Sequence, residues 1–157
     1  MADKLIIKDP LLPIQYIDSN GEIKTLDPKD ILQFNKNNLD FDKQANYYYL
    51  IARLSDRKQR ELDDYKVQLD SLYAQLYQAY MTSDDLRKEN NNRKPSEAMI
   101  TSGINNDQNY IKAQNYLNKL ANDSKLLVRF LKAIELKMNM MQSESAQQRV
   151  DFTKRNG

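Results

Sequence analysis

Two sets of basic side chains in this sequence recur at the spacing of one helix face. The sets are Arg53, Arg57 and Arg60, and Lys125, Arg129 and Lys132. Within each set the steps are four and three residues, which place side chains on the same side of an α-helix. Rows of cationic side chains are suited to contacting the phosphates of a nucleic-acid backbone. The alternative is that both rows are ordinary solvated faces, because the acidic residues Asp56, Glu61 and Glu135 lie nearby.

A third group of basic residues falls in the polar stretch 82–95, which we expect to be a basic linker between two long helices. A linker of this kind adds phosphate contacts without fixed geometry. Lys58 stands beside the first row in sequence. The candidate DNA-binding residues are therefore Arg53, Arg57, Lys58, Arg60, Lys88, Arg93, Lys94, Lys125, Arg129 and Lys132.

Several kinds of chemistry lack their usual residues. The 157 residues include no histidine and no cysteine, which removes the common general bases, nucleophile pairs and transition-metal ligands. Three glycines spread over the chain cannot form a phosphate-cradling loop. The adjacent acids at 63–64 and 84–85 are better explained as solvated faces or helix caps than as metal ligands. We expect no enzyme activity, no cofactor and no metal.

Two long helices are expected to carry these basic rows. The stretch Tyr47–Met81 has no glycine or proline, and a heptad seam of apolar residues begins at Leu62. Ser55 and Lys58 interrupt the same frame further back, so we expect the face near the arginines to be incompletely packed. A second seam runs from about Asp107 past Met141, and the residues after it are expected to fray. Each seam requires a partner helix.

The ten tyrosines allow two interpretations. Their rings can stack nucleic-acid bases. At helical spacing beside leucines they are more often buried in a core or a subunit interface. We expect the buried role for Tyr65, Tyr73 and Tyr77.

Shorter elements are expected around the two helices. Runs at 14–17 and 23–26, joined through Asn20-Gly21, predict a β-hairpin. Asp27-Pro28 predicts the start of a short helix over 29–34. Another short helix is expected at 96–101, closed by the glycine at position 103.

The composition favours a mainly α fold. The mean hydropathy is −0.82 and 29% of residues are charged, which suits long helices that bury a seam better than a compact β core. We expect residues 1–29 to form a β-hairpin arm and 30–157 a helical domain of two long antiparallel helices, assembled as an oligomer. The absence of cysteine favours a reducing compartment. No apolar run has the length of a membrane span, and no signal peptide is expected.

A succession of short motifs resembles a known family. The motifs are Ala45-Asn46 opening a long helix, Lys94-Pro95-Ser96-Glu97, Asp107 with Ile111-Lys112, and Leu131-Lys132-Ala133-Ile134. In this order and spacing the chain resembles the phage recombination mediator family typified by UvsY, over about residues 30–150. At Leu76-Tyr77-Gln78-Ala79 this chain lacks two basic residues of the family pattern. Arg53 and Arg57 then become the first candidates for the DNA site.

The resemblance implies a function in DNA recombination, repair and replication. It implies a ring-like homo-oligomer that binds single-stranded DNA and helps a RecA-like recombinase replace the single-strand-binding protein. Such a phage protein would act in the cytoplasm of the bacterial host and would hydrolyse no nucleotide. The alternatives are a non-enzymatic helical scaffold, such as a phage structural or assembly protein without DNA binding, and a coiled-coil adaptor for another protein.

Overall fold

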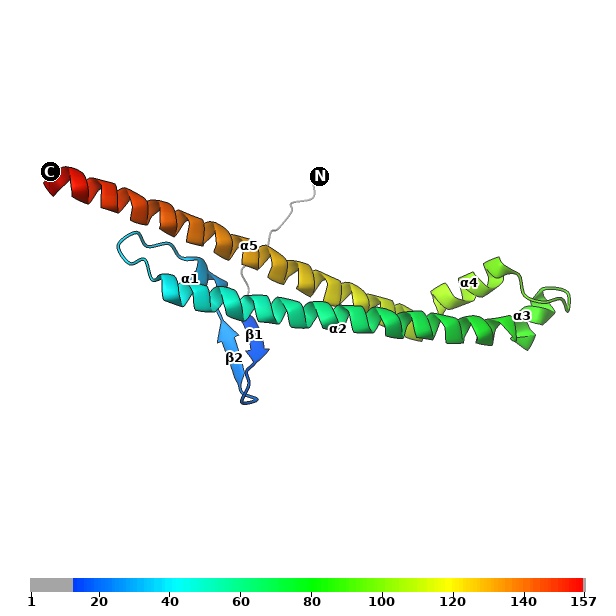
Figure 1. Ribbon diagram of the computed structural model, residues 1–157. Helices are drawn as coiled ribbons and strands as arrows, with labels where there is room; N and C mark the ends of the chain where they lie inside the picture. The colour runs from blue at the N-terminus through cyan, green and yellow to red at the C-terminus, as the bar shows by residue number, and fades with distance from the viewer. Residues whose placement is uncertain (1–12, 157) are drawn as a thin grey trace, which may run out of the picture. The chain divides into compact units, whose positions relative to one another are not determined.

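The computed structural model describes residues 13–156 and is mainly α-helical in that range (Figure 1). A two-stranded hairpin precedes the helices, so the predicted mainly α fold with an N-terminal hairpin is confirmed. Residues 1–12 of the expected arm lie outside the described residues. The elements are β1 (Ile14–Ile17), β2 (Ile23–Leu26), α1 (Pro28–Leu32), α2 (Phe41–Met81), α3 (Asp84–Glu89), α4 (Glu97–Asn106) and α5 (Gln108–Asn156).

The chain divides into two compact units, and both long helices contribute to each. The first unit takes the chain up to Arg53 and from Val128 onward, and the second unit takes Leu54–Leu127. Each unit is described separately below. No helix in the described range is long and apolar enough to cross a membrane.

In the first unit, the hairpin turn is held by Asp18. Its Oδ1 accepts hydrogen bonds from the Asn20 and Glu22 amides at 2.8 and 3.0 Å. Gly21 has a φ of +82°, in the left-handed region that glycine enters without strain. The strands pair antiparallel from Ile14 with Leu26 to Ile17 with Ile23. The predicted hairpin and its Asn-Gly turn are therefore confirmed.

The rest of the first unit packs α1 and the start of α2 on the C-terminal half of α5. Asp27 caps α1 and Pro28 occupies its first turn, as predicted, although the helix ends at Leu32. The Lys137 ammonium donates to the Ile31 carbonyl at 2.5 Å. The Tyr48 hydroxyl donates to Glu135 at 3.0 Å. The core here includes Ile31, Ile51, Phe130, Ile134 and Met141.

In the second unit, α2 and α5 run antiparallel along a continuous seam. Gln59 accepts from the Ser124 hydroxyl at 3.0 Å, and further along, Tyr73 meets Tyr110 edge-on with centroids 5.9 Å apart. Tyr65, Tyr73 and Tyr77 are half-buried, consistent with their expected packing role. The buried seam includes Leu62, Leu69, Leu120 and Leu127.

The expectation that Ser55 interrupts the seam was wrong. Ser55 is 7% exposed and occupies the seam as a small buried side chain, and Ser124 does the same on α5 at 4% exposed. A hydroxyl is small enough to be enclosed between two helices and can hydrogen-bond locally.

Three other boundaries differ from the prediction. Residues 82–95 contain α3, whose N-cap Ser83 accepts from the Leu86 amide. Helix α4 continues to Asn106 and contains Gly103. The missing side chain of this glycine makes room for the Tyr80 ring. Helix α5 extends through the tail expected to fray, and Gln147 there donates to Asp151 one turn on at 2.9 Å.

Candidate nucleic-acid interface

The arginine row of α2 lies on the side of the helix turned away from the seam. Arg53, Arg57 and Arg60 are exposed, whereas Ile51 and Ser55, on either side of Arg53 in sequence, are buried. Residues two positions apart in a helix are about 200° apart around its axis, so this alternation of buried and exposed side chains follows from the helical period. The exposure of the arginines therefore follows from the seam itself, not from a break in it.

The second row has the same relation to α5. Lys125, Arg129 and Lys132 are exposed, and Phe130 and Ile134 beside them are 7% and 0% exposed. Each row thus occupies the outer face of its own helix. The packed seam fixes the direction in which both rows point.

The unit boundary divides the predicted residues. Arg53, Arg129 and Lys132 belong to the first unit. The second unit holds Arg57, Lys58, Arg60, Lys88, Arg93, Lys94 and Lys125.

The predicted linker group lies on α3 and the loop after it. Lys88 is on α3 and forms a loose ion pair with Asp85 at 3.9 Å. Arg93 and Lys94 are exposed on the loop before α4. The loop reverses through Asn91 and Asn92, whose φ values of 53° and 61° lie in the left-handed region that asparagine tolerates. The loop is also tied by the Asn90 side chain, which donates to the Lys94 carbonyl at 2.6 Å.

Among the candidates, Lys58 forms a much shorter ion pair than Lys88 does. Its ammonium is 2.6 Å from Glu61, and its side chain is 29% exposed. The Lys58 hydrogen bond is the main cause that lowers the pKa of Glu61, and the Tyr116 hydroxyl adds to it. In contrast, none of Arg53, Arg57, Arg60, Lys125, Arg129 and Lys132 forms an ion pair within residues 13–156. These six cations are therefore not ion-paired within the described residues, although the charge of Arg57 also helps to lower the pKa of Glu61.

Tyr49 is a candidate binding residue that the sequence reasoning missed. Its ring is 64% exposed, and the Arg53 guanidinium lies 5.9 Å from the ring centroid. The spacing of four residues between Tyr49 and Arg53 was a signal in the sequence. The signal was ambiguous because tyrosines also occupy positions 47 and 48, and only the structure shows that these two are half-buried whereas Tyr49 is exposed.

Comparison of the chain with models of protein families, with curated proteins and with solved structures finds no match in any of the three. What the site can bind therefore has to be inferred from its own side chains. Exposed guanidinium and ammonium groups bind phosphate oxygens, and an exposed tyrosine ring offers a flat face for a base.

Proposed function

We propose that this protein binds single-stranded DNA through the outer face of α2. The observation that carries the proposal is the pairing of Arg53 with the exposed ring of Tyr49 in the first unit. Arg57 and Arg60, exposed on the part of α2 in the second unit, are further candidate contacts. Single-strand binding combines cations that track the backbone with aromatic rings on which bases stack. In the α5 row, by contrast, no tyrosine lies within one helical turn of Lys125, Arg129 or Lys132.

We further propose that the bound strand is handed to a RecA-like recombinase in place of the single-strand-binding protein, with the chain acting as a homo-oligomeric ring. The support for this step is the family resemblance of residues 30–150, together with large apolar side chains left exposed. In the first unit these include Leu136 at 64% and Met140 at 53% exposed, positions that a second copy would cover.

The test is a fluorescence titration of a labelled oligonucleotide at two salt concentrations. Wild-type binding should weaken strongly with salt, because each phosphate contact releases a counterion. Arg53→Ala with Arg57→Ala should weaken binding and reduce the log–log salt slope by about 0.7 for each lost contact. Tyr49→Leu should weaken binding with little change in that slope, because it removes stacking and no charge.

Matched controls separate this site from general charge effects. Lys112→Ala with Lys119→Ala removes two exposed cations of α5 outside both rows and should leave binding near the wild-type value. Lys125→Ala with Arg129→Ala tests the second row. If only the latter pair weakens binding, the site lies on α5. If neither pair does, the scaffold function is favoured.

A further inference from the structure

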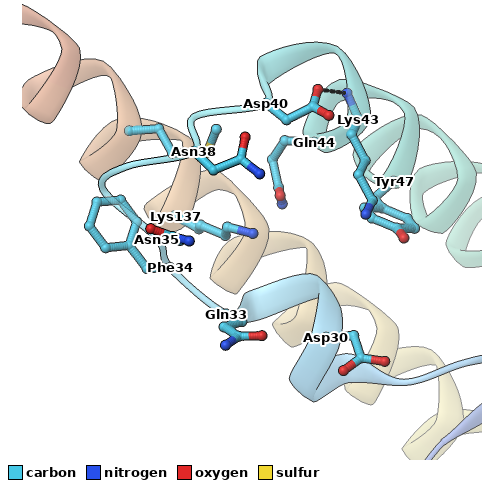
Figure 2. A pocket seen from close by; sticks show the side chains of 11 residues that line it. Asp30, Gln33, Phe34, Asn35, Asn38, Asp40, Lys43, Gln44, Tyr47 and Lys137 are labelled. Carbon is cyan, nitrogen blue, oxygen red and sulfur yellow. Dashed lines mark hydrogen bonds between the residues drawn. The ribbon is translucent and has the colours of Figure 1, made fainter.

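A pocket in the first unit is lined mainly by polar side chains. We call it the α1–α2 pocket, because it lies among α1, the segment that joins α1 to α2, the first turns of α2, and α5 (Figure 2). Its volume is about 230 Å³. This is below the range of about 300–1,000 Å³ that suits drug-sized ligands, so its size fits a group of a few heavy atoms. None of the candidate DNA-binding residues lines it.

Gln44 is the most unusual side chain of this pocket. The residue is 3% exposed, and its Nε2 has no hydrogen-bond partner. Figure 2 shows Gln44 extending from α2 into the space between the helices. A buried amide group without a partner is destabilising, so an acceptor oxygen placed beside Gln44 would recover the lost hydrogen bond.

Two lysines add positive charge at the same place. The Lys137 ammonium donates to the Ile31 carbonyl and keeps two donors unused. The Lys43 ammonium lies 5.9 Å from the centroid of the Tyr47 ring, which also lines the pocket. Burial lowers the pKa of Lys137, and the charge of Lys43 lowers it further. A nearby anion would offset both effects, because an opposite charge favours the charged form of the lysine.

Two carboxylates line the pocket as well, and they limit the ligand. Asp40 caps α2, with its Oδ1 accepting from the Lys43 amide at 2.9 Å. Asp30 is an exposed residue in the first turn of α1. Because these acids balance the two lysines in number, a large polyanion is disfavoured. The unused donors of Gln44 and Lys137 still require acceptor oxygens.

We propose that the α1–α2 pocket binds a compact oxyanion, a carboxylate or phosphate group of a small molecule, through Gln44, Lys137 and Lys43. The Gln44 amide and the Lys137 ammonium donate to the oxygens, and Lys43 contributes charge. The proposal is independent of the DNA-binding function, because it uses none of the residues of the two basic rows.

The experiment is isothermal titration calorimetry of the full chain with sodium phosphate and, separately, sodium acetate, at an ionic strength held constant with sodium chloride. We expect saturable binding of at least one anion, and the tighter of the two identifies the group. Lys137→Met should reduce the affinity at least tenfold. Lys154→Met, which removes an exposed cation near the end of α5, should retain it.

Gln44→Met provides a second variant that is expected to fold well. It replaces an unpartnered amide by an apolar side chain of similar length, so its thermal midpoint without anion should rise above the wild type. The stabilisation that added anion gives the wild type should disappear in this variant. The proposal is overturned if neither anion binds, or if Lys137→Met and Gln44→Met both keep wild-type affinity. Anion binding abolished by Arg53→Ala with Arg57→Ala instead would also overturn it.

Discussion

Gly103 illustrates how one residue sets the distance between two helices. A Cβ built on this glycine would lie 2.9 Å from two ring carbons of Tyr80 and 3.3 Å from its Cγ. The Tyr80 ring has little freedom to withdraw, because Cγ is fixed near the α2 backbone and the hydroxyl contacts Asp107 at 3.4 Å. Burial is the main cause that raises the pKa of Tyr80, with Asp107 adding to it.

Gly103→Ala is therefore expected to destabilise the protein. Alanine gains about 1 kcal/mol in helix propensity, but overpacking a close contact costs about 1–3 kcal/mol, so we expect a net loss of about 1 kcal/mol. Chemical denaturation monitored by circular dichroism measures it. Ser102→Ala, at the exposed neighbouring position of α4, serves as the control and should be neutral or slightly stabilising. A more stable Gly103→Ala protein would contradict the contact.

Glu61 leads to a prediction about pH. Its pKa is lowered by the hydrogen bond from Lys58 first, so the folded state favours the ionised carboxylate. The resulting stability is present above the ordinary glutamate pKa and is lost as pH falls through the lowered value. It should stay below about 1 kcal/mol, because the pair is partly solvated. A titration of the side-chain carboxyl by NMR should give a lowered pKa that rises in Lys58→Met. An unchanged pKa in that variant would exclude Lys58 as the cause.

At the residue scale, the sequence predicted exposure better than contact. The helical period was sufficient to place Arg53, Arg57 and Arg60 on a solvated face. The role of Gly103 was not predictable, because it depends on a tyrosine 23 residues earlier that only the packing of α4 brings near. The same holds for Gln44, whose isolation results from burial against other elements.

At the element scale, local signals set the boundaries that were predicted correctly. The hairpin follows from Asn20-Gly21, and α2 ends at Met81 because turn residues follow it. Helix α3 was missed, since six residues with a serine cap are too few to show a periodic apolar face. The tail of α5 is polar and mostly exposed, but it contains no proline and no glycine before position 157, so nothing in it stops the helix.

The β-hairpin is expected to be dispensable for the helical units. Its turn is stabilised by bonds within itself, including the 3.0 Å ion pair of Lys24 with Asp18. Ile17 and Ile23 are 57% and 73% exposed, so much of its apolar surface is not packed. Removing residues 1–26 leaves the Asp27 cap of α1 in place. Circular dichroism of the truncated protein should show nearly unchanged helicity and DNA binding should persist. Loss of the helical signal would place the hairpin in the core.

At the scale of the whole molecule, two helical seams leave apolar surface uncovered. Besides Leu136 and Met140 in the first unit, the second unit exposes Val67 at 69% and Leu126 at 46%. Single exposed apolar residues are ordinary on a protein surface, but Leu136 and Met140 are one helical turn apart on α5. With Phe34 they line a shared hollow of about 460 Å³. A second copy that packed against this hollow would cover these apolar side chains.

We expect the protein to sediment at micromolar concentration as a homo-oligomer larger than a dimer. Because hydrophobic contacts between copies would be lost, Leu136→Asn with Met140→Gln should shift the protein toward smaller species while its helicity is retained. Val150→Asn, at a 48% exposed apolar position near the end of α5, is the matched control and should leave the assembly intact. A dissociated variant that still binds an oligonucleotide, but with lower apparent affinity, would show that each copy carries its own α2 site and that assembly joins these sites into one track. A wild-type protein that sediments as a monomer would contradict the ring and leave α2 to bind DNA alone.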